Sequence, residues 1–298
     1  MRQKVISRIF GGLGNQLFCY AAARRLSIVN NAELIIDNVS GFVRDHKYKQ
    51  QYQLDHFTIP CRKATSMERL EPFSRIRCYL KRRVNRYRPF EKRRYIEQEG
   101  NKFDERLLRV RATGTIYLEG YWQSEGYFKD IESTVRADLR IKQPTDPANL
   151  ALAAYIQSRI AVAVHVRFFD LPGESGMHNA PRDYYNRALT YIETSIPAAH
   201  YFVFSDNPPA VRDYINLPDD RTTYVSHNRG DENAYADLWL MSLCQSFIIA
   251  NSTFSWWGAW LSEHPEKQVV APYFSICGRD RITSWGFEGL LPHSWIKL

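Results

Sequence analysis

The stretch that decides the fold is Val-Ile-Ser-Arg-Ile-Phe-Gly-Gly-Leu-Gly-Asn-Gln-Leu-Phe at residues 5–18. Residues 5–10 are β-rich, the glycines break the chain, and residues 16–29 have the apolar spacing of a helix. A second short strand is expected at 32–36. The pattern predicts a β-α-β unit whose glycine-rich turn lies at the carboxyl end of a strand, where α/β folds bind ligands.

The same alternation returns after the linker-like residues 142–147. Apolar strands are predicted at 160–166, 201–205, 223–226, 247–250 and 269–272, with helices near 182–195, 208–215, 233–245 and 253–263. Strands alternating with helices predict a mostly parallel sheet covered on both faces. We therefore predict an α/β protein of two facing Rossmann-like domains, residues 1–145 and 146–298. Residues 48–111 have no clean period and are predicted to be mostly helical and irregular.

Charge is concentrated in one segment of the 298 residues. The net charge is +8, yet residues 75–94 hold ten basic side chains against Glu91, a local balance of +9, so the remainder carries −1. A pI above 9 therefore does not by itself indicate a nucleic-acid-binding protein. The five cysteines are odd in number and lack a C-x-x-C spacing, which fits a reducing, cytoplasmic compartment and no thiolate metal site. No run of 18 apolar residues predicts a membrane span, and the first ten residues do not read as a signal peptide.

The glycine turn allows two interpretations. A dinucleotide-binding G-x-G-x-x-G would need a small residue where Leu17 stands, so an NAD-dependent oxidoreductase using the turn at Gly11–Gly14 is the weaker alternative, kept open by Asp37. The preferred interpretation is a backbone that approaches an anion or sugar at a helix N-terminus. The candidate binding residues are Gly12, Gly14, Asn15 and Gln16.

Polar residues follow three of the predicted strands. His165 and Arg167 share one side of the strand at 160–166, and a phosphate would explain the arginine, whose fork binds phosphate oxygens. Asp206 follows the next strand, either as a helix cap or as an acceptor for the N–H edge of guanine. Asn251 and the following residues lead a strand directly into a helix, which gathers N–H groups, hydroxyls and a positive helix end. The candidates in this segment are Asn251, Ser252, Thr253, Phe254 and Ser255.

Six ordered segments resemble glycosyltransferase family 11, the α-1,2-fucosyltransferases. They are Gly-Gly-Leu-Gly-Asn-Gln-Leu-Phe at 11–18, Gly-Tyr-Trp-Gln-Ser-Glu at 120–125, His-x-Arg-x-x-Asp at 165–170, Phe-Ser-Asp at 204–206, Asp-Leu-Trp-Leu-Met-Ser at 237–242 and Asn-Ser-Thr-Phe-Ser-Trp-Trp at 251–257. One departure is Phe168-Phe169, where the family often has Arg-Gly.

The resemblance implies a GT-B fold with a deep interdomain cleft and an acceptor-side N-terminal domain. It also implies a C-terminal domain that binds GDP-fucose, and inverting transfer of L-fucose to the 2-hydroxyl of a terminal β-galactoside, free or lipid-linked. Such transfer serves surface glycan or O-antigen synthesis. No Asp-x-Asp motif occurs, so we expect metal-independent transfer in which Arg167 and the helix start at 252–255 stabilise the leaving phosphate. The acceptor hydroxyl needs a base, and Glu174 and Asp170 are the candidates.

Two interpretations of the basic segment stay open. In the first, Ile76, Tyr79, Leu80, Val84 and Tyr87 pack inward while the charges face water. In the second, residues 75–94 hold the enzyme peripherally against anionic lipid headgroups at the inner membrane face. A basic nucleic-acid-binding module is the alternative from another class, and against it no recognisable docking motif occurs.

Overall fold

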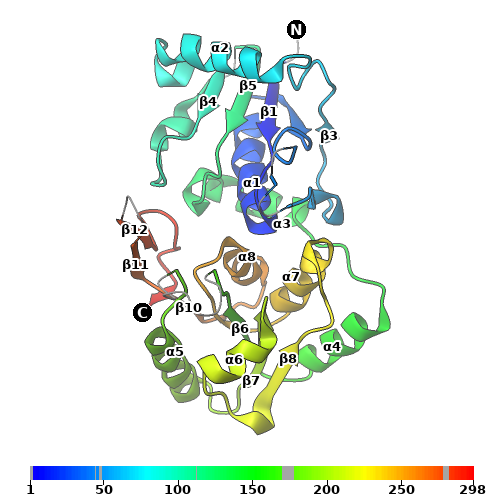
Figure 1. Cartoon of the computed structure of the whole chain (residues 1–298), viewed down its shortest axis with the longest axis vertical. Coiled ribbons are helices and arrows are strands. Elements are labelled where there is room, and N and C mark those ends of the chain that lie inside the picture. Colours follow the sequence, from blue (N-terminus) through cyan, green and yellow to red (C-terminus); the bar gives the residue numbers. More distant parts are fainter. Residues whose placement is uncertain (1–2, 44, 47–48, 112, 170–177, 278–281) are drawn as a thin grey trace. The chain divides into compact units, whose positions relative to one another are not determined.

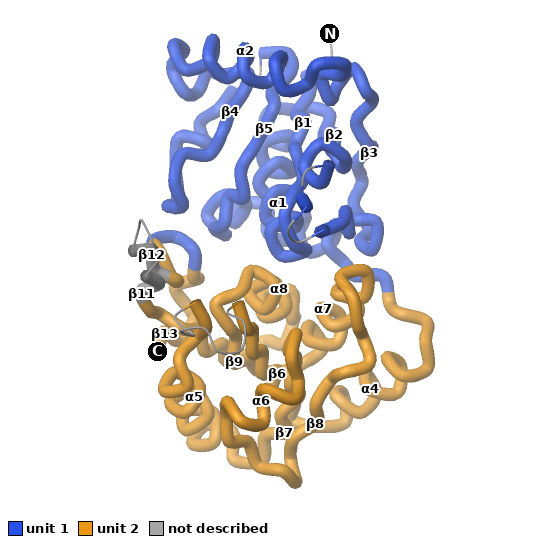
Figure 2. Tube along the Cα trace, viewed as in Figure 1, with its two compact units in different colours: residues 1–142, 288–290 blue, residues 143–287, 291–298 orange. Residues whose placement is uncertain are grey.

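The chain forms two compact units in a computed structural model, which describes residues 3–43, 45–46, 49–111, 113–169, 178–277 and 282–298. Unit 1 contains residues 1–142 and 288–290, and unit 2 contains residues 143–287 and 291–298 (Figure 2). Residues 288–290 therefore return to the N-terminal unit, a crossing that the sequence pattern does not predict. Among the described residues, no helix has the length and apolar character needed to cross a bilayer.

Unit 1 is built on a parallel sheet whose five described strands run in the order β3-β2-β1-β5-β4 (Figure 1). The strands are β1 (Lys4–Arg8), β2 (Glu33–Asp37), β3 (Arg62–Lys63), β4 (Tyr95–Glu97) and β5 (Thr115–Glu119). The α-helices are α1 (Leu13–Val29), α2 (Ser74–Arg86) and α3 (Glu132–Asp138). Short 3-10 helices occupy Leu54–His56, Phe90–Lys92, Glu105–Arg109, Glu125–Tyr127 and Lys129–Ile131.

Unit 2 contains a second parallel sheet, whose six described strands run in the order β13-β10-β9-β6-β7-β8. These strands are β6 (Ala161–Val166), β7 (His200–Ser205), β8 (Thr222–Val225), β9 (Ser246–Ile248), β10 (Val269–Ala271) and β13 (Ile296–Lys297). The helices are α4 (Pro147–Gln157), α5 (Arg182–Ser195), α6 (Pro208–Tyr214), α7 (Ala234–Ser242) and α8 (Thr253–Leu261), with 3-10 turns at Asp219–Arg221 and Asp231–Asn233. An antiparallel pair, β11 (Phe274–Cys277) and β12 (Ile282–Trp285), completes the unit.

The strands and helices predicted from alternation in the C-terminal half are confirmed, because strands buried on both faces are continuous apolar runs. Every residue of β6 is buried. The prediction for residues 48–111 is wrong in part. This region contains one α-helix, α2, and it also supplies β3 and β4 to the sheet. These strands are too short to show an alternation that sequence alone could reveal.

The two faces of the unit 1 sheet differ in character. On one face, the Ser7 hydroxyl lies 3.4 Å from the Cys19 carbonyl oxygen of α1, among buried apolar residues. The next residue along β1, Arg8, points to the opposite face and forms an ion pair with Glu119 of β5. This second face carries only a small described apolar cluster of Ile6, Ile35 and Ala64, with Tyr117 packed against it.

Helix α2 covers the polar face through Glu119 rather than through apolar packing. The Glu119 carboxylate is buried, and Arg8, Arg82 of α2 and the Tyr95 hydroxyl all contact it. Burial alone would raise the pKa of Glu119, but the Tyr95 hydroxyl and the two guanidinium groups outweigh it, and the pKa is lowered. A cavity of about 710 Å³ remains between α2 and the sheet, lined in part by Tyr79, Arg82 and Tyr117.

We expect Glu119→Ala to lower the free energy of unfolding by about 3 kcal/mol, because it removes the buried carboxylate that Arg8 and Arg82 share and leaves Arg82 with Glu97, 3.6 Å away, as its acidic partner. Urea unfolding followed by circular dichroism measures it. Glu105→Ala is the control, since Glu105 forms an exposed pair with Arg109 and should cost less than about 1 kcal/mol.

The pH dependence of the free energy of unfolding gives a second test of the Glu119 interactions. Because its folded pKa is depressed, its contribution is present above about pH 4.3, the ordinary glutamate value, and is lost as the pH falls through the folded value. Equal stability of the Glu119→Ala variant and the wild type at pH 7 would contradict the assignment.

Candidate functional site

The predicted donor-side residues of unit 2 gather at the carboxyl edge of its sheet. Strand β6 lies between β7 and β9, and all three run parallel. Arg167, Asp206 and Asn251 follow these strands within three residues of their ends. Because the carboxyl ends of neighbouring parallel strands meet at one edge, residues from three distant segments come together there.

Arg167 and Asp206 form an ion pair at this edge. Arg167 Nη1 lies 3.2 Å from Asp206 Oδ2, and the main-chain N–H of Phe168 donates to Asp206 Oδ1 at 3.2 Å. Asp206 thus orients the arginine and the backbone that follows it. Both side chains are partly exposed, so the pair adds little stability, and positioning is its main effect. Whether Asp206 also binds guanine stays a prediction.

His165 lies in β6, two residues before Arg167, and its side chain is buried. Burial, together with the nearby Arg167 charge, lowers the pKa of His165 to about 3, so the ring is neutral at physiological pH. The ring lies 5.6 Å from that of Phe254, and its Nδ1 is buried without a hydrogen-bond partner among the described atoms. A neutral imidazole can donate one hydrogen bond and accept another, but it cannot supply positive charge.

Some of the polar side chains at the start of α8, after β9, form hydrogen bonds within the protein. Ser252 caps α8, its hydroxyl accepting from the Phe254 N–H at 3.3 Å, and the buried Ser255 hydroxyl donates to the Ser252 carbonyl oxygen at 3.3 Å. Asn251 is buried, and its Nδ2 donates to the His178 carbonyl oxygen at 2.8 Å. Its Oδ1 is buried without a partner among the described residues. What this end of α8 offers to a ligand is therefore chiefly the backbone N–H groups and the helix dipole.

Close packing behind α8 fixes where that helix end points. A Cβ placed on Gly258 would meet Met241 Sδ at 2.3 Å, so a larger residue there would force the Met241 side chain of α7 to move. Trp256, Trp257 and Trp260 are buried, with ring centroids 5.0–6.2 Å apart. The tryptophans belong to the packing of unit 2.

Two supporting residues could not be found from the sequence. The Tyr185 hydroxyl donates to the His165 carbonyl oxygen at 3.0 Å, and Asn179 Oδ1 accepts from the Phe169 N–H at 2.7 Å. Both hold the backbone on either side of Arg167. Neither carries a local signal, because a tyrosine on an amphipathic helix and an asparagine before one are common.

In unit 1, two of the family-like segments come together. Asn15 Oδ1 accepts from Gln123 Nε2 at 2.8 Å, and Cys19 Sγ lies 3.1 Å from the Gly120 carbonyl oxygen. Gly11 has a positive φ of 79°, and a Cβ on it would meet Asn15 and Tyr121 at 3.0 Å. The turn therefore needs glycine at position 11, ahead of Gly12, which is the N-cap of α1.

Gln16 has a structural function in this turn. The side chain is buried, its Nε2 donates to the carbonyl oxygens of Gly11 and Gln51, and its Oε1 accepts from the Gln53 N–H. One donated and one accepted bond tie the turn to residues 51–53, and the bond to Gly11 closes the turn itself. A ligand contact by Gln16 stays a prediction, as it does for Gly12, Gly14 and Asn15.

Both candidate bases, Asp170 and Glu174, lie outside the described residues. In the part of the chain that the structure describes, no group of three or more His, Cys, Asp or Glu side chains is placed to hold a metal ion. Metal-independent transfer stays a prediction.

Asp237 is a further titratable group that the sequence analysis did not single out as a site residue. It follows β8 on α7, and Asn228 Nδ2 donates to its Oδ1 at 2.8 Å. Asn228 also binds Asn149 at the start of α4, with 2.8 and 2.9 Å contacts. Burial raises the pKa of Asp237 to about 7, although the Asn228 bond opposes the shift.

Two parallel α/β sheets, one with an arginine and a helix N-terminus at its carboxyl edge, are typical of GT-B-like glycosyltransferases. The chain belongs to glycosyltransferase family 11, since residues 9–275 match the family profile described as Glycosyl transferase family 11. The family predicted from the six ordered segments is thus confirmed. Membership of this family argues against the two alternatives, the NAD-dependent oxidoreductase and the nucleic-acid-binding module.

Two curated relatives from Escherichia coli span nearly the whole chain. The O-antigen biosynthesis glycosyltransferase WbnK is 30% identical and covers 98% of this chain and 99% of its own. An alpha-1,2-colitosyltransferase is 27% identical, with coverage of 99% and 98%. The chain is therefore a glycosyltransferase, and its donor sugar and acceptor need a separate argument.

Solved structures agree in fold. The fucosyltransferase NodZ from Bradyrhizobium has a TM-score of 0.51 at 14% identity and covers 95% of this chain and 98% of its own. Arabidopsis thaliana FUT1, solved with GDP, has a TM-score of 0.51 at 13% identity, with coverage of 90% and 70%. The predicted GT-B-like α/β class is confirmed, while the cleft between the units stays a prediction.

Asp237 gives a pH-dependent test of this network. Its folded pKa of about 7 lies above the unfolded value near 4, so its contribution is fully present below about pH 4 and is lost as the pH rises to about 7. Asp237→Asn stays neutral and can still accept from Asn228. We expect the melting temperature of the variant, relative to the wild type, to rise between pH 5 and pH 8. A difference that does not change with pH would contradict the raised pKa.

Proposed function

We propose that this enzyme transfers L-fucose from GDP-fucose, with inversion, to the 2-hydroxyl of a terminal β-galactoside during surface glycan or O-antigen synthesis. The observation that carries the proposal is Arg167, oriented by Asp206 at the carboxyl edge of β6, with the N-terminus of α8 following the adjacent strand. Family membership and the O-antigen relative support it.

The chemistry follows from the charge that develops. Breaking the bond between fucose and GDP leaves negative charge on the β-phosphate, and the enzyme must meet it with cations or N–H donors. Arg167 supplies a planar fork for phosphate oxygens, and α8 supplies backbone N–H groups with a positive dipole end. We propose that these two elements replace a metal ion. We also propose a cytoplasmic location, supported by the free thiols of Cys19, Cys61, Cys78 and Cys244.

A second donor, GDP-colitose, is favoured by two observations. One relative is named as a colitosyltransferase, and this chain has Phe168-Phe169 where the family often has Arg-Gly. Phe169 is half exposed, and the Arg167 guanidinium lies 5.5 Å from its ring centroid. Colitose is fucose without the 3-hydroxyl. A site that hydrogen-bonds this hydroxyl would reject colitose by a factor of about 10⁴, whereas an apolar site would accept both sugars.

The deciding experiment offers both donors to the purified enzyme with a panel of free β-galactosides. We expect α-1,2-linked fucoside, identified by NMR, with release of GDP and full turnover in EDTA. GDP, but not NAD, should raise the melting temperature, because a ligand that binds only the folded state stabilises it. Product from GDP-colitose alone would establish the second donor, a different linkage would refute the acceptor position, and activity lost on chelation would refute metal independence.

Arg167→Ala should lower kcat by about 10²–10³ while leaving the melting temperature unchanged, since it removes one donor to the developing charge. Arg167→Lys should also lose most activity, because an ammonium lacks the two-pronged geometry. Arg187→Ala, an exposed arginine on α5, is the matched control. Near-native turnover of the Arg167→Ala variant would remove the phosphate assignment.

A further inference from the structure

Helix α2 exposes a continuous row of large apolar side chains. Ile76, Leu80, Val84 and Tyr87 are 59, 53, 57 and 84% exposed, and their spacing of four, four and three residues places them on one face. Phe73, directly before the helix, extends the row, which we call the apolar stripe. Tyr79 is also exposed, so the predicted inward packing of Ile76, Tyr79, Leu80, Val84 and Tyr87 is wrong. A contiguous exposed apolar patch on a folded protein marks an interaction surface more often than scattered residues do.

The inward side of α2 is polar instead, and its bonds fix the orientation of the helix. Arg82 forms an ion pair with the buried Glu119, and the buried Asn85 accepts from the Arg94 N–H at 2.6 Å. Turning the stripe toward the sheet would break both contacts. It would also bring the stripe onto a face with a small apolar cluster and a buried carboxylate.

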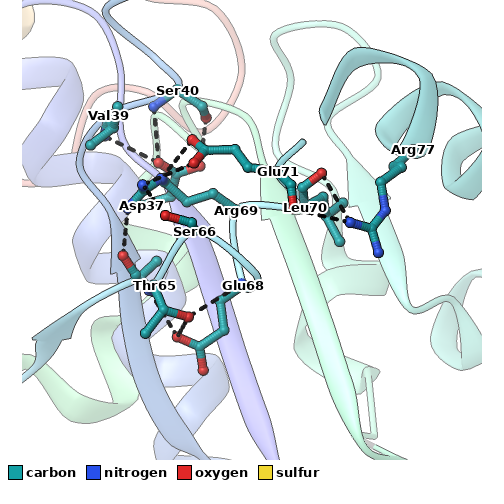
Figure 3. A network of polar contacts seen from close by, with 11 residues as sticks. Asp37, Val39, Ser40, Thr65, Ser66, Glu68, Arg69, Leu70, Glu71 and Arg77 are labelled. Atoms are coloured by element: carbon teal, nitrogen blue, oxygen red, sulfur yellow. Dashed lines mark hydrogen bonds and ion pairs between the residues drawn. The ribbon is translucent and has the colours of Figure 1, made fainter. Parts of the chain in front are cut away.

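A further anchor holds the start of the helix (Figure 3). Arg77 Nη1 reaches back to the carbonyl oxygens of Leu70 and Glu71, at 3.4 and 3.2 Å. The segment carrying these carbonyls is itself braced, because Arg69 pairs with Glu71 and donates to the Ala64 carbonyl oxygen at 2.7 Å. The outward direction of the stripe is therefore built into unit 1.

Basic side chains border the apolar stripe. With about 100° of rotation per residue, Arg83 and Arg86 lie on one side of the stripe and Arg77 on the other. All three are exposed, as are Arg75 and Arg88, and residues 73–90 contain no Asp or Glu. Arginine heads on long apolar stems can reach phosphates while the stripe enters an apolar layer.

We propose that α2 is an interfacial helix that binds the surface of an anionic lipid membrane. The apolar stripe enters the boundary between headgroups and acyl chains, and the exposed Arg83 and Arg86 bind lipid phosphates, while Arg77 holds the start of the helix. Pairing with a second copy would bring two strongly basic segments together. A nucleic acid would use the charges but not the aliphatic members of the stripe. The proposal concerns where the enzyme works, and its vesicle-binding measurement needs neither donor nor acceptor.

The test is sedimentation of the full-length protein with vesicles at low salt. We expect binding to vesicles containing phosphatidylglycerol, weakening as salt is added, and no binding to pure phosphatidylcholine. The triple variant Ile76→Ser, Leu80→Ser, Val84→Ser should lose binding about tenfold or more, and Arg83→Gln with Arg86→Gln should weaken it and flatten its salt dependence. Leu150→Ser with Ile160→Ser, exposed apolar residues of unit 2, is the matched control and should bind as the wild type.

Turnover of a soluble acceptor should be the same in the triple variant and the wild type. This separates membrane binding from transfer, and an unchanged melting temperature verifies folding. If the triple serine variant unfolds, the variant with Arg83→Gln and Arg86→Gln provides the test by itself. Absent binding to anionic vesicles, undiminished binding by both variants, a dimer that the serine variant disperses, or tight binding to an oligonucleotide in place of vesicles would each overturn the proposal.

Discussion

Unit 1 is organised around one buried carboxylate. Glu119 ends β5 on the sheet face opposite α1, and a buried charge without partners would be strongly destabilising. Its partners come from β1, β4 and α2, so satisfying one group holds together three distant segments. The same requirement keeps Arg82, rather than an apolar residue, on the inner side of α2. The exposure of the apolar stripe is a consequence of this arrangement.

Unit 2 is held together by apolar packing rather than by a buried charge. Its central strands are apolar on both faces, and a core of valine, isoleucine and tyrosine side chains from β6, β7 and α5 lies between the layers. The Tyr184 hydroxyl of α5 donates to the carbonyl oxygens of Ile249 and Val270, at 2.7 and 2.9 Å, and so ties this helix to the sheet. A rigid edge of this kind can hold Arg167 and Asp206 in a fixed geometry, which transition-state stabilisation requires.

Sequence patterns predicted what depends on local order. Apolar runs located the strands of unit 2, and the polar residues after β6, β7 and β9 located the candidate edge, because parallel strands share a carboxyl edge. Side-chain contacts that form only in the folded chain were not predictable. Asn179 supports Phe169 only after the chain has folded, and Asp237 acquires its raised pKa from burial beside Asn228. The stripe on α2 was visible in the sequence, but its direction depends on Glu119, more than thirty residues later.

The basic residues of segment 75–94 have different functions, as their contacts show. Arg82 neutralises Glu119, Arg77 binds main-chain carbonyl oxygens, and Arg93 pairs with Glu99 at 3.2 Å. The local balance of +9 therefore overstates what an anionic partner would meet. Exposed arginines remain at positions 75, 83, 86 and 88, and Arg83 and Arg86 border the stripe. A folding requirement explains the inner charges and leaves the outer ones unexplained. The outer charges share a helix with exposed aliphatic residues, a combination that a membrane interface accommodates and bulk water does not favour.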